Sequence, residues 1–174
     1  MTAVATKRPA GDADERTQLV GWLDVQRSIV RVKCEGLSEA DAHRKVLPTS
    51  PLMTVAGLVA HLRWNEYSWF QLNLAGVPDT GQTPWTDDGH VDAEMFVDDV
   101  PLAQLLDEYD EECARSNALV ATLPLDALEQ GTYRDDNPGS TRFILCHLIE
   151  ETARHLGHLD IIRELLDGRT GYTK

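Results

Sequence analysis

The 174-residue sequence has no uninterrupted apolar stretch of the ~20 residues that a membrane-spanning helix needs. It also lacks an apolar segment near the N-terminus of the kind that directs secretion. We therefore expect a soluble, cytoplasmic protein with no membrane partner.

Basic residues are scarce. The chain has 16 Lys and Arg against 29 Asp and Glu, a formal net charge of −13. This charge repels the phosphate backbone that nucleic-acid-binding proteins must attract, so we expect no nucleic-acid partner. Hydrophobic residues at 42% and charged residues at 26% are typical of a globular protein. We expect residues 1–13 to form a flexible tail and residues 14–174 to form a single domain.

Cysteine is also rare, with three residues and no CxxC pair. Cys34, Cys113 and Cys146 each lie in a helix-like stretch, where a small apolar residue would suit packing. We interpret all three as reduced packing residues and not as nucleophiles.

Alternating strand patterns and internal repeats are absent, and apolar residues instead recur every three or four positions, which is typical of amphipathic helices. We expect four helices, and their ranges are about 14–36, 54–76, 101–123 and 140–168. Pro101 suits the first turn of the third helix. Residues 77–99 show no sustained period and predict a long irregular connection. The pattern favours an all-α four-helix bundle with a long crossover connection, and an irregular all-α domain is the alternative.

A polar stripe interrupts the fourth helix. We expect its buried side to be defined by Phe143, Ile144, Leu148, Ile161, Ile162 and Leu165. Within an arc of about 80° on that same face lie His147, Glu151, His155 and His158. A carboxylate buried there without a partner would lose several kcal/mol of hydration, so Glu151 requires a cation or a paired charge.

A divalent metal site explains this stripe. Glu151 and His155 are four residues apart on one helix, and His61 lies on the inward face of the second helix. Two imidazoles and one carboxylate leave coordination positions open, as in catalytic sites, and suit Zn²⁺, Ni²⁺, Fe²⁺ or Mn²⁺. Availability decides among these ions, and we expect Zn²⁺. The alternatives are a salt bridge within the helix and a buried hydrogen-bonded network that only fixes helix packing.

Other polar residues have weaker assignments. His158 either orients a metal ligand or contacts the third helix. Trp64 and Asn65, one turn past the second-helix histidine, either line a pocket mouth or pack in the core. We interpret His147 as a hydrogen-bonded core residue. His90 lies in the acidic crossover, which we interpret as a solvated loop and not as a second cation site.

Two segments resemble the DinB-like family of four-helix metalloproteins. Residues 147–158 are similar to the last helix of that family and read HLIEETARHLGH, and residues 54–70 fit its second helix and read TVAGLVAHLRWNEYSWF. The similarity is greatest to the actinobacterial branch, which includes mycothiol-dependent transferases and the metal domain of mycothiol-dependent maleylpyruvate isomerase. Many members use three histidine ligands, whereas Glu151 here takes the first position of the fourth-helix pair, similar to the isomerase pattern.

The resemblance implies that His61, Glu151 and His155 hold a divalent metal. It implies transfer of the thiol mycothiol to a small electrophile through a metal-bound thiolate, which is the nucleophilic form of a thiol. The isomerase carries a further C-terminal domain, which this sequence does not show after its fourth helix, so we expect a stand-alone thiol transferase. The alternative is a non-catalytic metal-binding stress protein. Whether two copies pair as a homodimer through apolar helix faces stays open.

Overall fold

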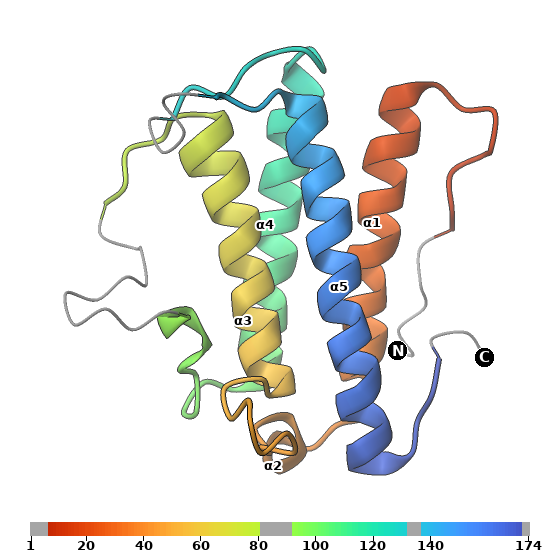
Figure 1. Ribbon diagram of the computed structural model, residues 1–174, viewed down its shortest axis with the longest axis vertical. Coiled ribbons are helices and arrows are strands. Elements are labelled where there is room, and N and C mark those ends of the chain that lie inside the picture. Colours follow the sequence, from red (N-terminus) through yellow and green to blue (C-terminus); the bar gives the residue numbers. More distant parts are fainter. Residues whose placement is uncertain (1–6, 81–91, 132–136, 172–174) are drawn as a thin grey trace.

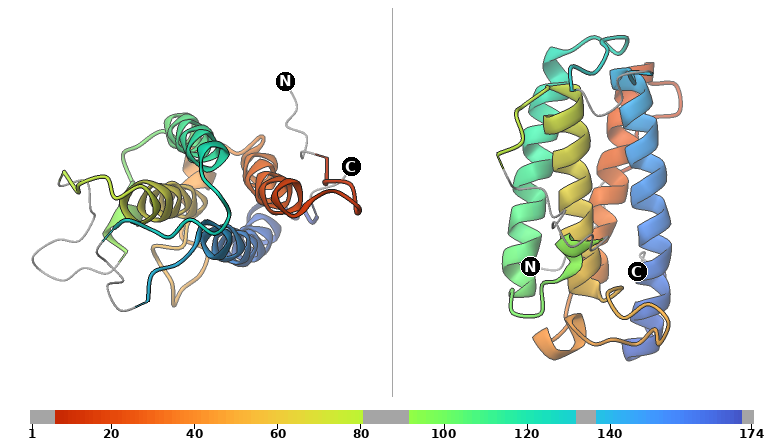
Figure 2. Two further views of the ribbon diagram at one scale, coloured as in Figure 1. Left: turned by 90° about the horizontal axis from the view of Figure 1, so that it is seen from above. Right: turned by 60° about the vertical axis from the view of Figure 1, so that its left-hand side comes forward.

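The computed structural model describes residues 7–80, 92–131 and 137–171. Four long helical segments lie side by side: α1 (Glu15–Cys34), α3 (Val55–Glu66), α4 (Leu102–Thr122) and α5 (Thr141–Asp167). Seen end-on, they occupy the corners of a four-sided bundle in the order α1, α5, α3, α4 (Figure 2). The described residues contain no strand, only an isolated bridge between Leu128 and Ser140. The prediction of an all-α four-helix bundle is confirmed.

The helices begin where the sequence predicts. Asp14, Thr54 and Ser140 each cap a helix, because the side chain of each accepts a hydrogen bond from the backbone N–H three residues later. Pro101 directly precedes α4 at its N-cap, one position before the first turn in which we expected it. α5 ends at Gly168, whose φ of 75° is the left-handed conformation that glycine adopts without strain.

The direction of the helices accounts for the long connection. α3 and α4 run the same way, opposite to α1 and α5 (Figure 1). The chain must therefore return along the whole bundle between the end of α3 and the start of α4. The described part of this crossover includes the short 3₁₀ helix η2 (Ala93–Met95). No described helix is long and apolar enough to cross a bilayer.

The second helix changes its geometry partway along. α3 continues without a break into a π-helix, η1 (Tyr67–Leu74), in which Ala75 N–H donates to the carbonyl of Phe70, five residues earlier. A π-helix holds more residues per turn than an α-helix, so the 3.6-residue period no longer predicts which side chains face inward. Trp69 thereby contacts His147 of α5, with ring centroids 4.3 Å apart.

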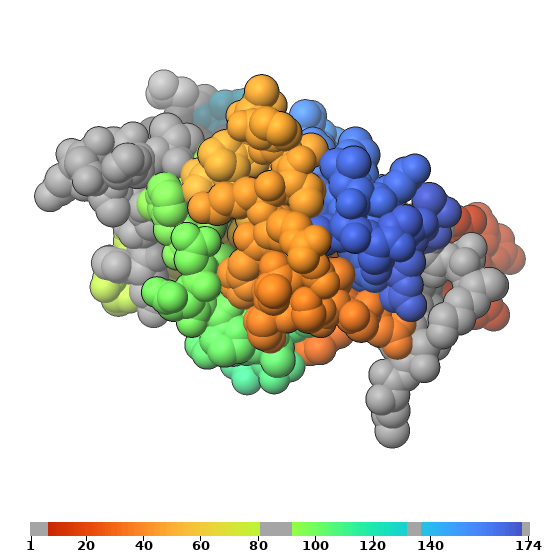
Figure 3. Space-filling view, turned by 90° about the horizontal axis from the view of Figure 1, so that it is seen from below, coloured from red at the N-terminus to blue at the C-terminus, as the bar shows by residue number. Residues whose placement is uncertain are grey.

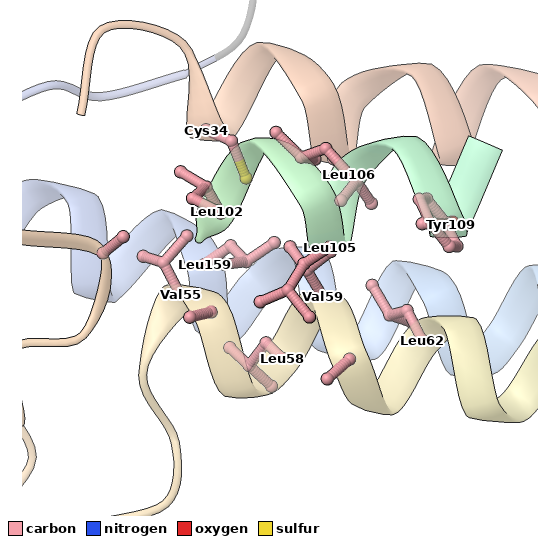
Figure 4. Packing of buried hydrophobic residues seen from close by; sticks show 14 of the residues in the cluster. Cys34, Val55, Leu58, Val59, Leu62, Leu102, Leu105, Leu106, Tyr109 and Leu159 are labelled. Atoms are coloured by element: carbon pink, nitrogen blue, oxygen red, sulfur yellow. The ribbon is translucent and has the colours of Figure 1, made fainter. Parts of the chain in front are cut away.

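Apolar side chains of all four helices fill the interior. Figure 4 shows the lower part of this core, where Val59 and Leu62 of α3 meet Leu105 and Tyr109 of α4 and Leu159 of α5. These five side chains are at most 3% exposed. The core holds α3 beside α5, which is the pair of helices that carries the candidate site.

The buried face of α5 differs from our expectation. Phe143, Ile161 and Leu165 are 44%, 53% and 57% exposed, although the sequence pattern placed them on the buried side. The buried side is instead formed by Ile144, Leu145, Leu148, Thr152, Leu156, Leu159 and Ile162. As a result the polar stripe runs along the edge of the α3–α5 contact and is half-buried, not central. An edge position keeps the stripe within reach of solvent.

Two of the three cysteines are packing residues, as expected. Cys34 and Cys113 are buried, and burial raises the pKa of the Cys34 thiol to about 12 and that of Cys113 further. Cys146 is exposed, so the prediction that it packs inside is wrong. It directly precedes His147 on α5, outside the buried face.

The segment before α3 closes one end of the bundle. It contains the short helix α2 (Glu39–Ala42). In Figure 3 it lies across this end of the bundle, between the segment that follows residue 92 and the C-terminal end of α5. His43 Nε2 lies 3.1 Å from the carbonyl oxygens of both Val97 and Val100. The Glu39 carboxylate accepts a hydrogen bond from Leu102 N–H. These contacts fix the returning crossover and the start of α4 against the α2 segment.

A buried ion pair joins α1 to α3. Arg27 donates two hydrogen bonds to the Glu66 carboxylate, at 2.8 and 2.6 Å, and a third to Asn117 of α4. The side chains of Arg27 and Glu66 are 6% and 1% exposed. Although burial opposes its charge, the neighbouring Glu66 carboxylate raises the pKa of Arg27. Such a pair is costly to break, because the remaining charge would be left without a partner.

Candidate metal centre

The three residues predicted as ligands come together. His61 of α3 and Glu151 and His155 of α5 each offer a ligand atom, and these atoms lie within 4.8 Å of one another. The imidazole rings of His61 and His155 are 4.7 Å apart between centroids, and His155 Nε2 is 3.4 Å from Glu151 Oε2. Their side chains are 17%, 23% and 13% exposed, so solvent still reaches them. We refer to these residues as the triad.

The helices explain this convergence. Side chains four residues apart on an α-helix lie one above the other on one face, so Glu151 and His155 present their polar atoms together. α3 packs beside α5 (Figure 1), and His61 of α3 thereby lies with a ligand atom within 4.8 Å of those of Glu151 and His155. Since all three residues stand on helices with buried apolar faces, the rigid core determines their spacing.

The surroundings of His155 favour its neutral form. Burial, and to a smaller extent the neighbouring His61 and His158, lower the pKa of His155 from 6.5 to about 4. At neutral pH the contact between His155 and Glu151 is therefore not an ion pair. Neutral imidazole is the form that binds a metal, so His155 is ready to act as a ligand without first losing a proton.

This pKa has a measurable consequence for the metal-free protein. We expect its free energy of unfolding to fall as the pH drops from 6.5 to about 4, because the unfolded chain takes up a proton at His155 near pH 6.5 and the folded chain only near pH 4. Across this window the unfolded state binds more protons, so stability rises with pH. Urea denaturation in the presence of a chelator, compared between wild type and His155→Gln, measures the effect. The variant should show the shallower pH dependence, and equal slopes would contradict the assignment.

A fourth polar side chain reaches His61 from the crossover. Glu94 of η2 lies with Oε1 2.5 Å from His61 Nδ1, and its side chain is only 7% exposed. His61, Asp92 and Glu94 form a further group with ligand atoms within 4.8 Å of one another. The sequence pattern did not reveal Glu94 as a site residue, because an acidic residue in an aperiodic loop carries no signal of which helix it contacts. His90 lies outside the described residues.

The other predicted pocket residues divide between the site and the core. Asn65 lies beside the triad, with its amide nitrogen 3.2 Å from His61 Nε2. His158 also lies beside it, with Nδ1 3.4 Å from His155 Nδ1. Trp64 is 6% exposed and packs with Tyr67, whose ring centroid is 5.7 Å away, in a small buried cluster.

His147 belongs to an aromatic contact one turn before Glu151. Its ring lies 4.3 Å from that of Trp69 and stacks parallel to Phe143 at 6.2 Å. Nδ1 of His147 is 3.9 Å from the Glu150 carboxylate, and His147, Glu150 and Glu151 form a third group that could hold an ion. Its side chain is 26% exposed, so His147 is not the enclosed core residue that we expected.

The donor atoms of the triad fit a divalent transition metal. Two imidazole nitrogens and one carboxylate oxygen are a common ligand set for Zn²⁺ and related ions, and three protein ligands leave positions open for other molecules. The neutral state of His155 suits this role, because neutral imidazole is the form that binds a metal. The buried carboxylate at His61 Nδ1 also suits it, because a ligating histidine usually donates its second N–H to such a group.

Comparison with known proteins identifies relatives at the family level. The family model described as mycothiol-S-transferase matches residues 18–168, which is most of the chain and includes the whole triad. No curated protein and no solved structure matches the chain.

Proposed function

Because the chain belongs to the mycothiol-S-transferase family, we propose that it transfers mycothiol to a small electrophile at a divalent metal held by the triad. The observation that carries this proposal is the convergence of His61, Glu151 and His155 from two helices within 4.8 Å. Zn²⁺ is the ion that we propose, and Ni²⁺, Fe²⁺ or Mn²⁺ would suit the same donors.

The bound ion would supply one piece of chemistry, which is to coordinate the thiol sulfur and favour its nucleophilic thiolate form. His155 and Glu151 hold this position from one helix, and His61 holds it from the other. Their partial exposure leaves room for a thiol to approach from the edge of the α3–α5 contact.

The state of the cysteines supports a nucleophile that comes from the substrate. The thiolate is the reactive form of cysteine. Cys34 and Cys113 are buried with raised pKa values, so at neutral pH they remain thiols that solvent does not reach. Cys146 is exposed but stands outside the triad.

The experiment is a conjugation assay with zinc-loaded protein, mycothiol and monobromobimane. In the reaction a carbon–sulfur bond forms, bromide leaves and the thiol proton passes to solvent. We expect conjugation well above the uncatalysed rate, loss of this rate with a chelator, and recovery with added Zn²⁺. Glutathione at the same concentration is the control thiol and should react more slowly.

The assay also separates the two functions that the sequence left open. Zinc-loaded protein that binds one ion and accelerates no thiol would favour the non-catalytic metal-binding protein. Acceleration that persists after complete removal of the metal would contradict the proposed role of the triad.

A further inference from the structure

Glu94 occupies a position that the proposed function does not use. Its carboxylate comes from the crossover, far from the triad in sequence, and lies against the back of the His61 ring. The side chain is 7% exposed, and Oε2 is buried with no hydrogen-bond partner among the described residues. A carboxylate so enclosed needs a donor, and His61 Nδ1 at 2.5 Å is the donor that it contacts.

We infer that Glu94 is a positioning residue that holds His61 in the Nδ1–H tautomer and directs its Nε2 lone pair toward the cation site. The inference rests on the proposed function for the presence of the cation, but the tautomer itself does not depend on a metal.

The hydrogen-bond chemistry of the two neighbours of His61 agrees on this tautomer. An ionised carboxylate can only accept, so the 2.5 Å contact with Glu94 requires a hydrogen on Nδ1. Asn65 presents its amide nitrogen, which can only donate, to Nε2 at 3.2 Å, so Nε2 must carry the lone pair. Nε2 is thus available for a metal, with Asn65 as its hydrogen-bond partner in the metal-free protein.

The fold holds Glu94 in this place through close backbone packing. An added Cβ at Gly57, one turn before His61, would lie 3.4 Å from the Met95 carbonyl and 2.4 Å from that of Leu52. The absence of a side chain at Gly57 therefore lets the Leu52 carbonyl approach α3, and the Met95 carbonyl comes to ordinary contact distance. On the other side His43 contacts the carbonyls of Val97 and Val100. The backbone that carries Glu94 is consequently held in place by contacts with α3 and with His43.

A rival role for Glu94 is direct metal binding together with His61 and Asp92. That role would require a lone pair on His61 Nδ1. The hydrogen bond to Glu94 instead places a hydrogen on Nδ1. Asp92 is also exposed, whereas Glu94 is enclosed. The geometry therefore favours a Glu94 that hydrogen-bonds the metal ligand His61 over a Glu94 that itself binds the metal.

The first test is the tautomer of His61 in metal-free wild-type protein, read by long-range ¹H–¹⁵N NMR of the imidazole. We expect a protonated Nδ1 and an unprotonated Nε2. In Glu94→Gln the same spectrum should show a weaker preference, because the Gln amide can donate as well as accept, while the Asn65 amide still donates to Nε2. A wild-type ring protonated at Nε2 alone would overturn the inference, and this measurement needs no variant and no mycothiol.

The second test is zinc affinity, measured by competition with a chromophoric chelator. Loss of a carboxylate behind a ligating histidine typically weakens metal binding by about 10- to 100-fold, and we expect a fall in this range for Glu94→Gln. Asp92→Asn is the matched control and should bind zinc as wild type does. Wild-type affinity in Glu94→Gln would overturn the inference, as would a loss in Asp92→Asn as large as that in Glu94→Gln. A wild-type protein that binds zinc but conjugates no thiol would refute the proposed function and leave both tests decisive.

Discussion

Replacing His155 with alanine should remove nearly all bound zinc from the purified protein. The structure offers two imidazoles and one carboxylate within 4.8 Å, so the variant would retain only one of the two nitrogen donors. Complete structural zinc sites with four ligands bind with about 10–16 kcal/mol, or roughly 3 kcal/mol for each ligand. We therefore expect zinc affinity to fall by at least about 100-fold. Elemental analysis of protein purified without chelators, followed by chelator competition, gives both the stoichiometry and the affinity.

The matched control is His147→Ala. His147 is also a half-buried histidine on α5, two turns before His155, and it belongs to a different group of potential ligands with Glu150 and Glu151. If the triad is the site, this variant keeps its zinc. Loss of zinc in His147→Ala with retention in His155→Ala would move the site toward the start of α5. Equal metal in wild type and His155→Ala would remove the basis of the proposed function.

The largest effect on stability should come from Arg27→Met. This change leaves the Glu66 carboxylate, which is 1% exposed, without its bidentate partner. Breaking a buried ion pair from one side typically costs about 3–5 kcal/mol. For a chain of this size, we expect Tm to fall by about 10 °C or more. Thermal unfolding followed by circular dichroism measures the change.

Arg31→Met provides the comparison, since Arg31 lies one turn further along α1 and pairs with Asp107 and Asp110 at the surface. Exposed pairs contribute about 1 kcal/mol or less, so this variant should melt close to wild type. The double variant Arg27→Met with Glu66→Leu should recover much of the lost stability, because no unpaired charge then remains buried. Equal falls in Tm for Arg27→Met and Arg31→Met would show that burial does not determine how much an ion pair contributes to stability.

Much of the fold could be predicted because its signals are local. The caps at Asp14, Thr54 and Ser140 mark helix starts through hydrogen bonds that span three residues. The spacing of Glu151 and His155 places both on one face of any regular helix. Such features depend on backbone geometry alone, so sequence reasoning reaches them without knowledge of the packing.

The wrong or missing predictions concern features that depend on how the helices pack together. Phe143, Ile161 and Leu165 also recur at helical spacing, and spacing alone does not tell which of two adjoining apolar arcs a neighbouring helix will cover. The π-helix from Tyr67 has no propensity signal that separates it from an α-helix. Glu94 was missed because its partner stands 33 residues away on another element, and only the folded chain brings the two together.

The parallel course of α3 and α4 has an evolutionary consequence. It obliges the chain to carry a long return segment (Figure 1), and the described end of that segment contacts the triad through Glu94. Residues 75–80, the described start of that segment, stand outside the helices that present the triad, so they can be exchanged without altering the spacing of its donor atoms. Substrate preference can therefore diversify among descendants of this bundle while the spacing of the three side chains is inherited intact.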